Sequence, residues 1–281
     1  MASSKKKYAL CLFGLPPMAC NKNVKNVKKD LSHILWKKNV IDRNDIDVFM
    51  HVWGEDDSER LQEKFEPIKF MNEKQIVFHS QDDPRLMMWG DSYPEDYNCT
   101  AINMFYSQAY SAKKSIEMKK LWEKEKGFKY DAVMISRIDC LWFTPVDFNQ
   151  FRPSRFYISS WNQERSLWGP NGCKLPSRSN KTTIKRKYKK ILDYWFVSSS
   201  KNIDAFGELY DYVSQWLSEQ TIDEKLSNHS LKKDFLEHIG LWENVRFKFY
   251  VHTDHTIQRH FYFFKDYKKP RFKNIAKLLN D

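Results

Sequence analysis

The chain has 281 residues and a formal net charge of +11 at pH 7, with 30% charged, 41% hydrophobic and 16% aromatic residues. This composition supports a sizeable core, and no apolar run approaches the roughly 18 residues that a transmembrane helix requires. The basic start is followed by only a short apolar stretch, 8–15, which predicts a first β-strand instead of a signal peptide. We therefore expect a soluble cytoplasmic protein with no signal peptide or transmembrane segment.

The positive charge favours an anionic partner, such as nucleic acid, an acidic membrane or a phosphorylated ligand. The five cysteines are scattered and form no Cys-x-x-Cys pair, which argues against a zinc cluster and predicts reduced thiols. Neither Gly-x-Gly-x-x-Gly nor Gly-x-x-x-x-Gly-Lys-Ser/Thr occurs in the sequence. The phosphate-binding loops of dinucleotide enzymes and P-loop nucleotidases are therefore excluded.

The first half of the chain predicts an alternation of strands and helices. Apolar runs predict strands over 8–14, 45–53, 75–79 and 132–135. Apolar residues at spacings of three and four predict helices over 22–38, 59–65 and 100–125, the last ending at Gly127. This alternation predicts an α/β protein, a Rossmann-type, mostly parallel sheet with helices on both faces.

The second half is more polar after Pro145 but continues with regular elements. We expect strands over 156–161, 193–200 and 246–252, and helices over 204–218 and 229–239. A basic run, 185–190, either closes over a bound anion or is a solvated loop. No linker divides the chain, so residues 1–281 predict a single domain.

The chemistry is expected where the buried run 132–135 breaks into Ser136, Arg137 and Asp139. A charged pair at a buried strand is costly unless the charges meet a partner. In an open α/β sheet, ligands bind at the carboxyl ends of the strands. Arg137 and Asp139 are therefore either a structural ion pair or ligand contacts.

Four segments, taken in order, resemble nucleotide-sugar glycosyltransferases of the GT-A type: 9–16, 47–53, 130–139 and 193–197. The resemblance is in particular to the small glycosyltransferases encoded by large algal viruses, which include a xylosyltransferase. It implies a GT-A-like fold, a nucleotide-sugar donor bound by residues 8–143, and a glycan acceptor, an oligosaccharide or a glycoprotein glycan, bound by 144–281. It also implies a viral protein that works in the cytoplasm of an infected host cell.

The same resemblance implies a divalent metal ion, Mn²⁺ or Mg²⁺, held by an Asp-x-Asp motif. Here that position reads Arg137-Ile138-Asp139, so the first acid is replaced by arginine. Asp139 can still bind a metal ion or a ribose, whereas Arg137 can bind a phosphate or pair with a carboxylate. A late histidine often completes such a site, which makes His252 and His255 the candidates; the alternative is a pair of surface histidines.

Inverting transfer needs a carboxylate that accepts the proton of the acceptor hydroxyl. Asp193 is the first candidate, because the resemblance places an acid there, and Asp254 is the second. The alternative for Asp193 is that it caps or anchors the strand that follows it.

The nucleoside is expected at the ends of the first two strands. Phe13, Gly14 and Leu15 close the first strand, where backbone groups can read a uracil edge. His51 and Trp53 end the second strand, and Trp53 either stacks on a ligand ring or packs in the core.

These residues predict a glycosyltransferase that moves a sugar, with xylose suggested by the resemblance, from a UDP-sugar to a glycan hydroxyl with inversion. One alternative is a basic protein that binds nucleic acid. The basic residues are spread over helix faces and no nucleic-acid-binding motif occurs, so this alternative is not favoured. Another is a glycan-binding module derived from a transferase that lost its first metal acid.

Overall fold

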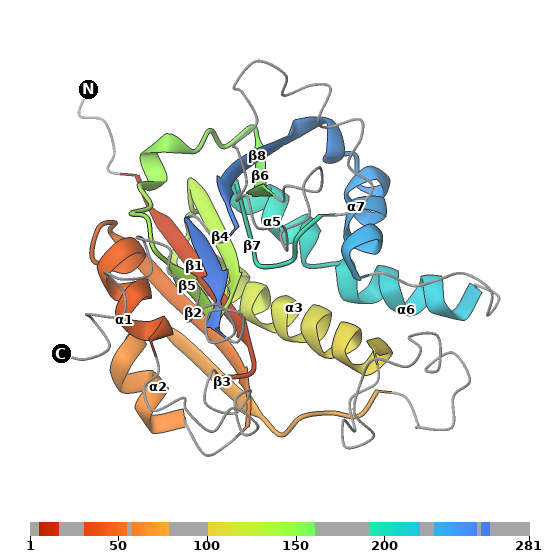
Figure 1. The fold of residues 1–281 in the computed structure, drawn as a ribbon, viewed down its shortest axis with the longest axis horizontal. Helices are drawn as coiled ribbons and strands as arrows, with labels where there is room; N and C mark the ends of the chain where they lie inside the picture. The colour runs from red at the N-terminus through yellow and green to blue at the C-terminus, as the bar shows by residue number, and fades with distance from the viewer. Residues whose placement is uncertain are drawn as a thin grey trace, which may run out of the picture.

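The computed structural model describes residues 6–16, 31–54, 58–78, 101–160, 191–219, 228–251 and 254–258. Seven strands form one sheet in the order β3-β2-β1-β4-β7-β6-β8 (Figure 1). Their bounds are β1 Tyr8–Gly14, β2 Ile46–Trp53, β3 Lys69–Glu73, β4 Ala132–Arg137, β6 Phe156–Ser160, β7 Trp195–Ser198 and β8 Val245–Tyr250. Of these seven strands, β7 alone runs antiparallel to its neighbours. A small second sheet pairs β5, Cys140–Trp142, with β9, His255–Ile257.

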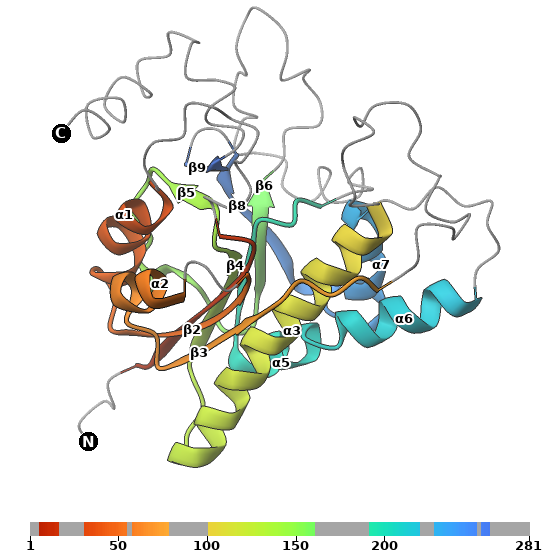
Figure 2. The same ribbon diagram turned by 90° about the horizontal axis from the view of Figure 1, so that it is seen from below.

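Helices cover both faces of the large sheet (Figure 2). One face carries α1, Ser32–Trp36, with its π-helical continuation Lys37–Ile41, and α2, Ser58–Phe65. The other carries α3, Ala101–Lys126, α5, Ser200–Phe206, α6, Leu209–Glu219, and α7, Asn228–His238. The predicted α/β class is confirmed, and strands from both halves of the chain share one sheet.

The central strand β1 shows why the sequences of the central strands are continuous apolar runs and do not alternate between apolar and polar residues. Ala9, Cys11 and Phe13 enter the core beneath α3, and the intervening residues enter the core beneath α1 and α2. A strand buried on both faces needs apolar side chains in both directions. This is how the first and fourth strands could be predicted from the sequence.

The longest helix, α3, crosses the sheet with an unusual polar line on its buried side. The line recurs every four residues and includes Ser107, Ser111, Ser115, Lys119 and Glu123, all buried. The small serine side chains let the helix lie close to the strands, and the charged pair is satisfied within the core. The helix ends as predicted at Gly127, whose φ of 69° lies in the left-handed region that glycine tolerates.

The third strand was predicted in the wrong place. The structure forms β3 at Lys69–Glu73, immediately after α2, where it pairs in parallel with β2. Residues 75–78 are irregular, and Val77 is 73% exposed, whereas Phe78 stacks on Tyr106 of α3. In the apolar run after β3, only Phe78 thus packs against a helix, and the run does not form a strand.

Two other predicted elements differ in extent. Residues 17–30 lie outside the described part, so the first helix is described only from Ser32. It extends beyond the predicted end at residue 38, to Ile41. The predicted helix 204–218 is two helices, α5 and α6, separated at Gly207. A Cβ at Gly207 would lie 3.2 Å from the Asp204 carbonyl oxygen and 3.3 Å from Ile116 Cγ2 of α3, so the chain lies close to α3 at this point and a larger residue would require small shifts.

Within the described ranges, none of the helices combines the length and apolar character that crossing a bilayer demands.

Candidate functional site

The carboxyl ends of β1, β2 and β4 meet at one edge of the sheet. In the strand register, Phe13 of β1 lies opposite His51 of β2 and Arg137 of β4. The amide of Ile138 donates a hydrogen bond to the Phe13 carbonyl oxygen at 3.0 Å, which ties the two strand ends together. The structure therefore brings together Phe13, Gly14, His51 and Arg137, which were predicted from separate segments.

Arg137 and Asp139 form a bidentate ion pair at this edge. Arg137 Nε donates to Asp139 Oδ1 at 2.8 Å, and Nη2 donates to Oδ2 at 2.7 Å. The Asp139 side chain is 4% exposed and that of Arg137 is 16% exposed. Burial disfavours the charged guanidinium, but the carboxylates of Asp139 and Asp193 outweigh burial and raise the pKa of Arg137. Of the two expected arrangements, the structure contains the Arg–Asp pair.

Asp193 lies beside this pair, on the segment that leads into β7. Its Oδ2 accepts a hydrogen bond from Gln108 Nε2 of α3 at 2.7 Å. Lys232 Nζ of α7 lies 3.8 Å from the same oxygen and donates to Gln108 Oε1 at 2.8 Å. Burial, reinforced by Arg137 and opposed by Asp193, lowers the pKa of Lys232 to about 8.

Arg137, Asp139, Asp193, Lys232 and Gln108 are called the charge cluster below. Its two cations and two carboxylates come from the β4 end, the turn after it, the segment before β7 and helix α7. Buried ion pairs rarely stabilise a fold more than apolar residues of similar size would. Perturbed charged groups at the carboxyl edge of a parallel sheet therefore mark a candidate functional site.

Sequence reasoning missed Gln108 and Lys232. Their mutual contact spans 124 residues, so no local motif could reveal it. One signal was present: Lys232 lies four residues before Leu236 on the buried side of α7, where a lysine interrupts an apolar line.

His51 joins β2 to β1 and α3 through a buried hydrogen-bond network. Its Nδ1 lies 2.7 Å from Ser111 Oγ and its Nε2 lies 2.9 Å from Glu73 Oε2. Gly14 N donates to the same Ser111 oxygen at 2.9 Å. Burial lowers the pKa of His51 despite the opposing effect of Glu73, so a neutral ring that donates from Nε2 and accepts at Nδ1 fits this network. The network fixes Gly14, whose φ is 109°, at the end of β1.

Trp53 lies in an aromatic cluster. Its ring stacks on Tyr110 at 5.5 Å and meets the His51 ring edge-on at 4.9 Å, and Trp53 is 1% exposed. Trp53 is thus packed in the core, and a ligand would have to displace Tyr110 to stack on its indole. A contact between Trp53 and a nucleoside stays a prediction. Leu15 follows Gly14 and is half-buried at the same edge.

Asp254 and His255 serve the small β5–β9 sheet. Asp254 Oδ1 accepts from Thr144 Oγ1 at 2.9 Å, and its carbonyl oxygen accepts from Phe143 N at 2.8 Å. The other end of this ladder joins Gln258 N to the Asp139 carbonyl oxygen. Asp254 is thus four residues along the ladder from Asp139, about 13 Å at 3.3 Å per residue. The structure does not bring Asp254 to the charge cluster.

The two predicted histidine ligands have different outcomes. His255 Nε2 accepts a hydrogen bond from Trp195 Nε1 at 3.0 Å and lies 2.9 Å from Ser159 Oγ. Its ring is fully buried against Trp142 and Trp195. His252 lies outside the described residues.

The described residues do not fit a divalent metal ion at Asp139. Both oxygens of that carboxylate already accept hydrogen bonds from Arg137. In the described part of the chain, no three side chains of His, Cys, Asp or Glu gather as metal ligands. Arg137, which stands where the motif has its first acid, pairs with Asp139 instead, and the expected Mn²⁺ or Mg²⁺ stays a prediction.

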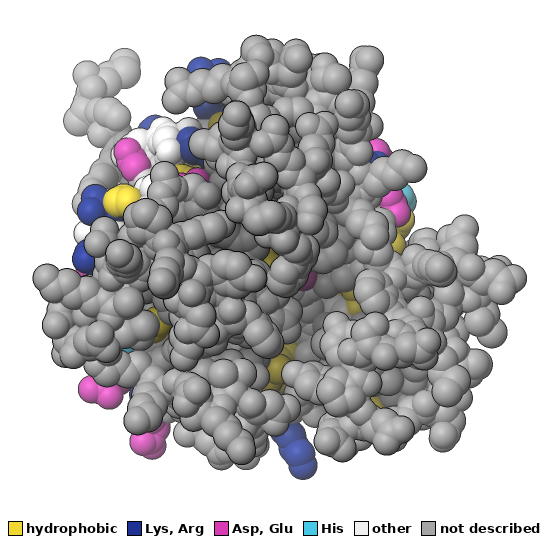
Figure 3. Space-filling view, in the orientation of Figure 1, with side chains coloured by type: hydrophobic (Ala, Val, Ile, Leu, Met, Phe, Trp, Pro, Cys, Tyr) yellow, Lys and Arg dark blue, Asp and Glu magenta, His cyan; other side chains and the backbone are white. Residues whose placement is uncertain are grey.

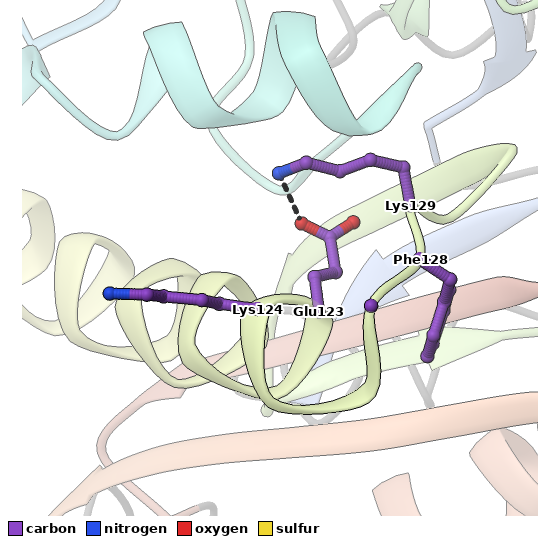
Figure 4. A pocket seen from close by; sticks show the side chains of 5 residues that line it. Glu123, Lys124, Phe128 and Lys129 are labelled. Carbon is purple, nitrogen blue, oxygen red and sulfur yellow. Dashed lines mark hydrogen bonds and ion pairs between the residues drawn. The ribbon is translucent and has the colours of Figure 1, made fainter.

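A second set of charges lies at the opposite end of β4, in which Lys119 and Glu123 are buried, Asp204 is partly buried and Lys129 is 65% exposed. Lys119 Nζ donates to Glu123 Oε2 at 3.0 Å and to Asp204 Oδ1 at 2.6 Å, and Lys129 Nζ donates to Glu123 Oε2 at 2.8 Å. This set, called the brace, joins α3 to α5. A hollow of about 470 Å³ adjoins it, and Figure 4 shows Lys129 reaching back to Glu123 while Lys124 points away. The hollow is lined by one acid, Glu123, and two lysines, Lys124 and Lys129.

Figure 3 shows one face of the molecule, on which the described acidic and basic side chains appear only at the margins, with both signs side by side at the upper left. Nucleic-acid binding would favour a continuous basic patch, and this face does not test that alternative.

Comparisons with known proteins give only distant likenesses. No protein-family model matches the chain, and no curated protein matches it. One similar solved structure is a nucleoside-diphosphate-sugar pyrophosphorylase from Vibrio cholerae RC9, at 9% identity and a TM-score of 0.44, covering 89% of this chain and 94% of that one. Another is mouse xyloside xylosyltransferase 1 in its apo form, at 10% identity and a TM-score of 0.34, covering 87% and 85%. These likenesses are too distant to assign an activity.

Proposed function

We propose that this protein is a glycosyltransferase that moves a sugar from a UDP-sugar to a hydroxyl group of a glycan, with inversion. The observation that supports it most is the charge cluster at the carboxyl ends of the central parallel strands. Three of its members, Arg137, Asp139 and Asp193, lie in segments that carry the sequence resemblance. The donor sugar, with xylose the first candidate, and the link to viral enzymes rest on that resemblance alone.

Arg137 is the proposed contact for the donor diphosphate. Two of the five N–H donors of a guanidinium bind Asp139, and the others suit phosphate oxygens. Asp139 fixes the plane of the guanidinium, and the phosphate carries increasing negative charge as the sugar leaves. A preorganised cation at that position stabilises the transition state more than the ground state.

Asp193 is the proposed base. The acceptor oxygen attacks the anomeric carbon, and its proton passes to the Asp193 carboxylate. The bond from the anomeric carbon to the diphosphate oxygen breaks, and the leaving UDP keeps the electron pair. Attack on the face opposite to the leaving group inverts the anomeric configuration.

The donor proposal is tested by thermal unfolding in the presence of UDP, UDP-xylose and UDP-glucose, each with and without Mn²⁺. Binding to the folded state raises Tm as ligand concentration increases. With a donor identified, transfer to xylo-oligosaccharides and other glycans is followed by release of UDP.

Two variants then test the base. Asp193→Asn should keep donor binding but lower kcat by about 10²- to 10⁴-fold, the range for general-base catalysis. Asp131→Asn is the matched control, because Asp131 lies at the amino end of β4 and pairs with Lys7 N on the surface. Asp193→Asn with near-normal turnover would remove Asp193 from the mechanism.

Other outcomes would replace the proposal. No response to any nucleotide, with salt-dependent binding of DNA or RNA, would indicate a nucleic-acid-binding protein. Binding of oligosaccharides without any nucleotide would indicate a glycan-binding module.

A further inference from the structure

Lys232 and Gln108 act on the same oxygen of Asp193. Gln108 Nε2 donates to Oδ2 at 2.7 Å, and Lys232 Nζ lies 3.8 Å from it. The amide of Gln108 also accepts from Lys232 at 2.8 Å, so it connects the ammonium group to the carboxylate. Lys232 and Asp193 are buried, with side chains 5% and 6% exposed, and Gln108 is partly buried.

This arrangement does two things to a carboxylate. A hydrogen bond to the ionised form and a nearby cation both favour the charged state, which a base needs before it can accept a proton. The bridging amide also fixes where the carboxylate lies, because its own orientation is set by Lys232 on the other side. A hydrogen bond polarised by a neighbouring cation is stronger in a buried setting than in water.

We propose that Lys232 and Gln108 are positioning residues that hold the Asp193 carboxylate ionised and correctly placed for proton transfer. This inference rests on the proposed function for the role of Asp193, but the electrostatic coupling is measurable without any substrate. It assigns a role to helix α7, which contributed no predicted site residue.

The charged groups around Asp193 belong to three further elements. Lys232 comes from α7, Arg137 from the end of β4, and Asp139 pairs with Arg137 from the following turn. Gln108 of α3 is neutral, and Tyr194 lies against Arg137, 5.8 Å from ring centre to Cζ. A shift in the titration of Asp193 must therefore be attributed by removing one of these groups at a time.

The test measures the titration of the Asp193 carboxyl by ¹³C NMR, with its signal assigned from its loss in Asp193→Asn. Lys232→Met keeps the length and apolar stem of the side chain and removes its charge. Lys233→Met is the matched control, because the neighbouring Lys233 pairs with Glu237 along α7 at 2.6 Å. We expect the midpoint of Asp193 to move to higher pH in Lys232→Met and to stay at the wild-type value in Lys233→Met.

Gln108→Glu provides an independent variant of nearly the same shape. It replaces the amide donor with a carboxylate that repels Asp193, so it should move the midpoint in the same direction and further. In an active protein, the acid limb of the kcat/KM pH profile should move with the NMR midpoint, and kcat should fall more than KM rises. A purely structural role would lower Tm and leave the midpoint and the profile in place.

A folded Lys232→Met and a folded Gln108→Glu that both titrate like the wild type would overturn the inference. Where one variant fails to fold, the other decides. The absence of any UDP-sugar binding by the wild type would refute the proposed function separately, because the NMR titration uses no ligand. A midpoint that moves without any change in the pH profile of an active protein would also overturn the positioning role.

Discussion

The ion pair between Arg137 and Asp139 makes a quantitative prediction about stability. Removing one partner of a buried pair leaves an uncompensated charge and costs about 3–5 kcal/mol. Arg137 is 16% exposed and also faces Asp193, so Asp139→Asn should lie near the lower end, about 3 kcal/mol. Asp139 is only 4% exposed, so Arg137→Met, which leaves that carboxylate without its guanidinium, should cost about 4–5 kcal/mol.

The double variant separates the pair from its surroundings. Arg137→Met with Asp139→Asn removes both charges, and its cost should be smaller than the sum of the single costs by about 2–3 kcal/mol. Urea unfolding at pH 7, followed by circular dichroism, measures each free energy of unfolding. The surface pair of Lys113 and Asp211, 2.7 Å apart with Asp211 57% exposed, is the control, and Asp211→Asn should cost less than about 1 kcal/mol.

Two results would refute this reasoning. Single costs below about 1 kcal/mol would show that the charges are solvated or paired elsewhere when one is removed. Additivity within about 0.5 kcal/mol would show that the two side chains do not interact energetically despite their geometry.

Three further predictions concern the brace, the end of β1 and α7. Glu123→Gln should cost about 3–5 kcal/mol in urea unfolding, because the buried Lys119 then keeps only the partly buried Asp204 as an ionic partner. Burial raises the pKa of Glu123, but hydrogen bonds from Lys129 and neighbouring groups prevail and lower it. The ionised Glu123 therefore contributes its full stabilisation above the ordinary pKa of 4.5, and this stabilisation is lost as the pH falls below that value. The variant should lack this acid sensitivity. Gly14→Ala should cost about 1–3 kcal/mol in the same assay from its φ of 109° alone, because no atom lies within 4 Å of the added Cβ, and an unchanged stability would contradict this. Folding lowers the pKa of Lys232 from 10.5 to about 8, so the unfolded protein binds more protons than the folded protein between these pH values. The free energy of unfolding should therefore rise with pH in this range in the wild type but not in Lys232→Met.

Much of the fold could be predicted because local pattern and burial agree. Strand β1 and the first four residues of β4 are apolar because both of their faces are covered, and α3 is long, periodic and ended by Gly127. The prediction of β3 was wrong because an apolar run does not by itself establish burial or strand pairing. Ile76 and Val77 are exposed and only Phe78 contacts α3, whereas the less apolar Lys69–Glu73 forms the strand at the edge of the sheet.

The site was only partly predictable, for a different reason. Arg137 and Asp139 follow the carboxyl end of β4. Asp193 precedes β7, which runs antiparallel to β4, so its start lies at the same edge of the sheet. Lys232 reaches the same place from a helix, and a helical pattern does not reveal which neighbour a side chain meets. Asp254 was the second candidate for the base, but the β5–β9 ladder carries it away from Asp139.

The brace and the charge cluster lie at opposite ends of β4, and their positions distinguish a structural role from a functional one. The brace precedes β4, at the edge of the sheet where open α/β folds do not bind ligands, and its contacts join α3 to α5. The charge cluster follows β4, at the edge where they do, and its guanidinium retains both solvent exposure and donors beyond those that bind Asp139. Replacing Lys119 and Glu123 together with Met and Gln should therefore change stability without changing donor affinity. Replacing Arg137 and Asp139 together should remove donor affinity even where the protein stays folded, and equal effects of the two replacements on donor affinity would show that position along β4 does not distinguish them.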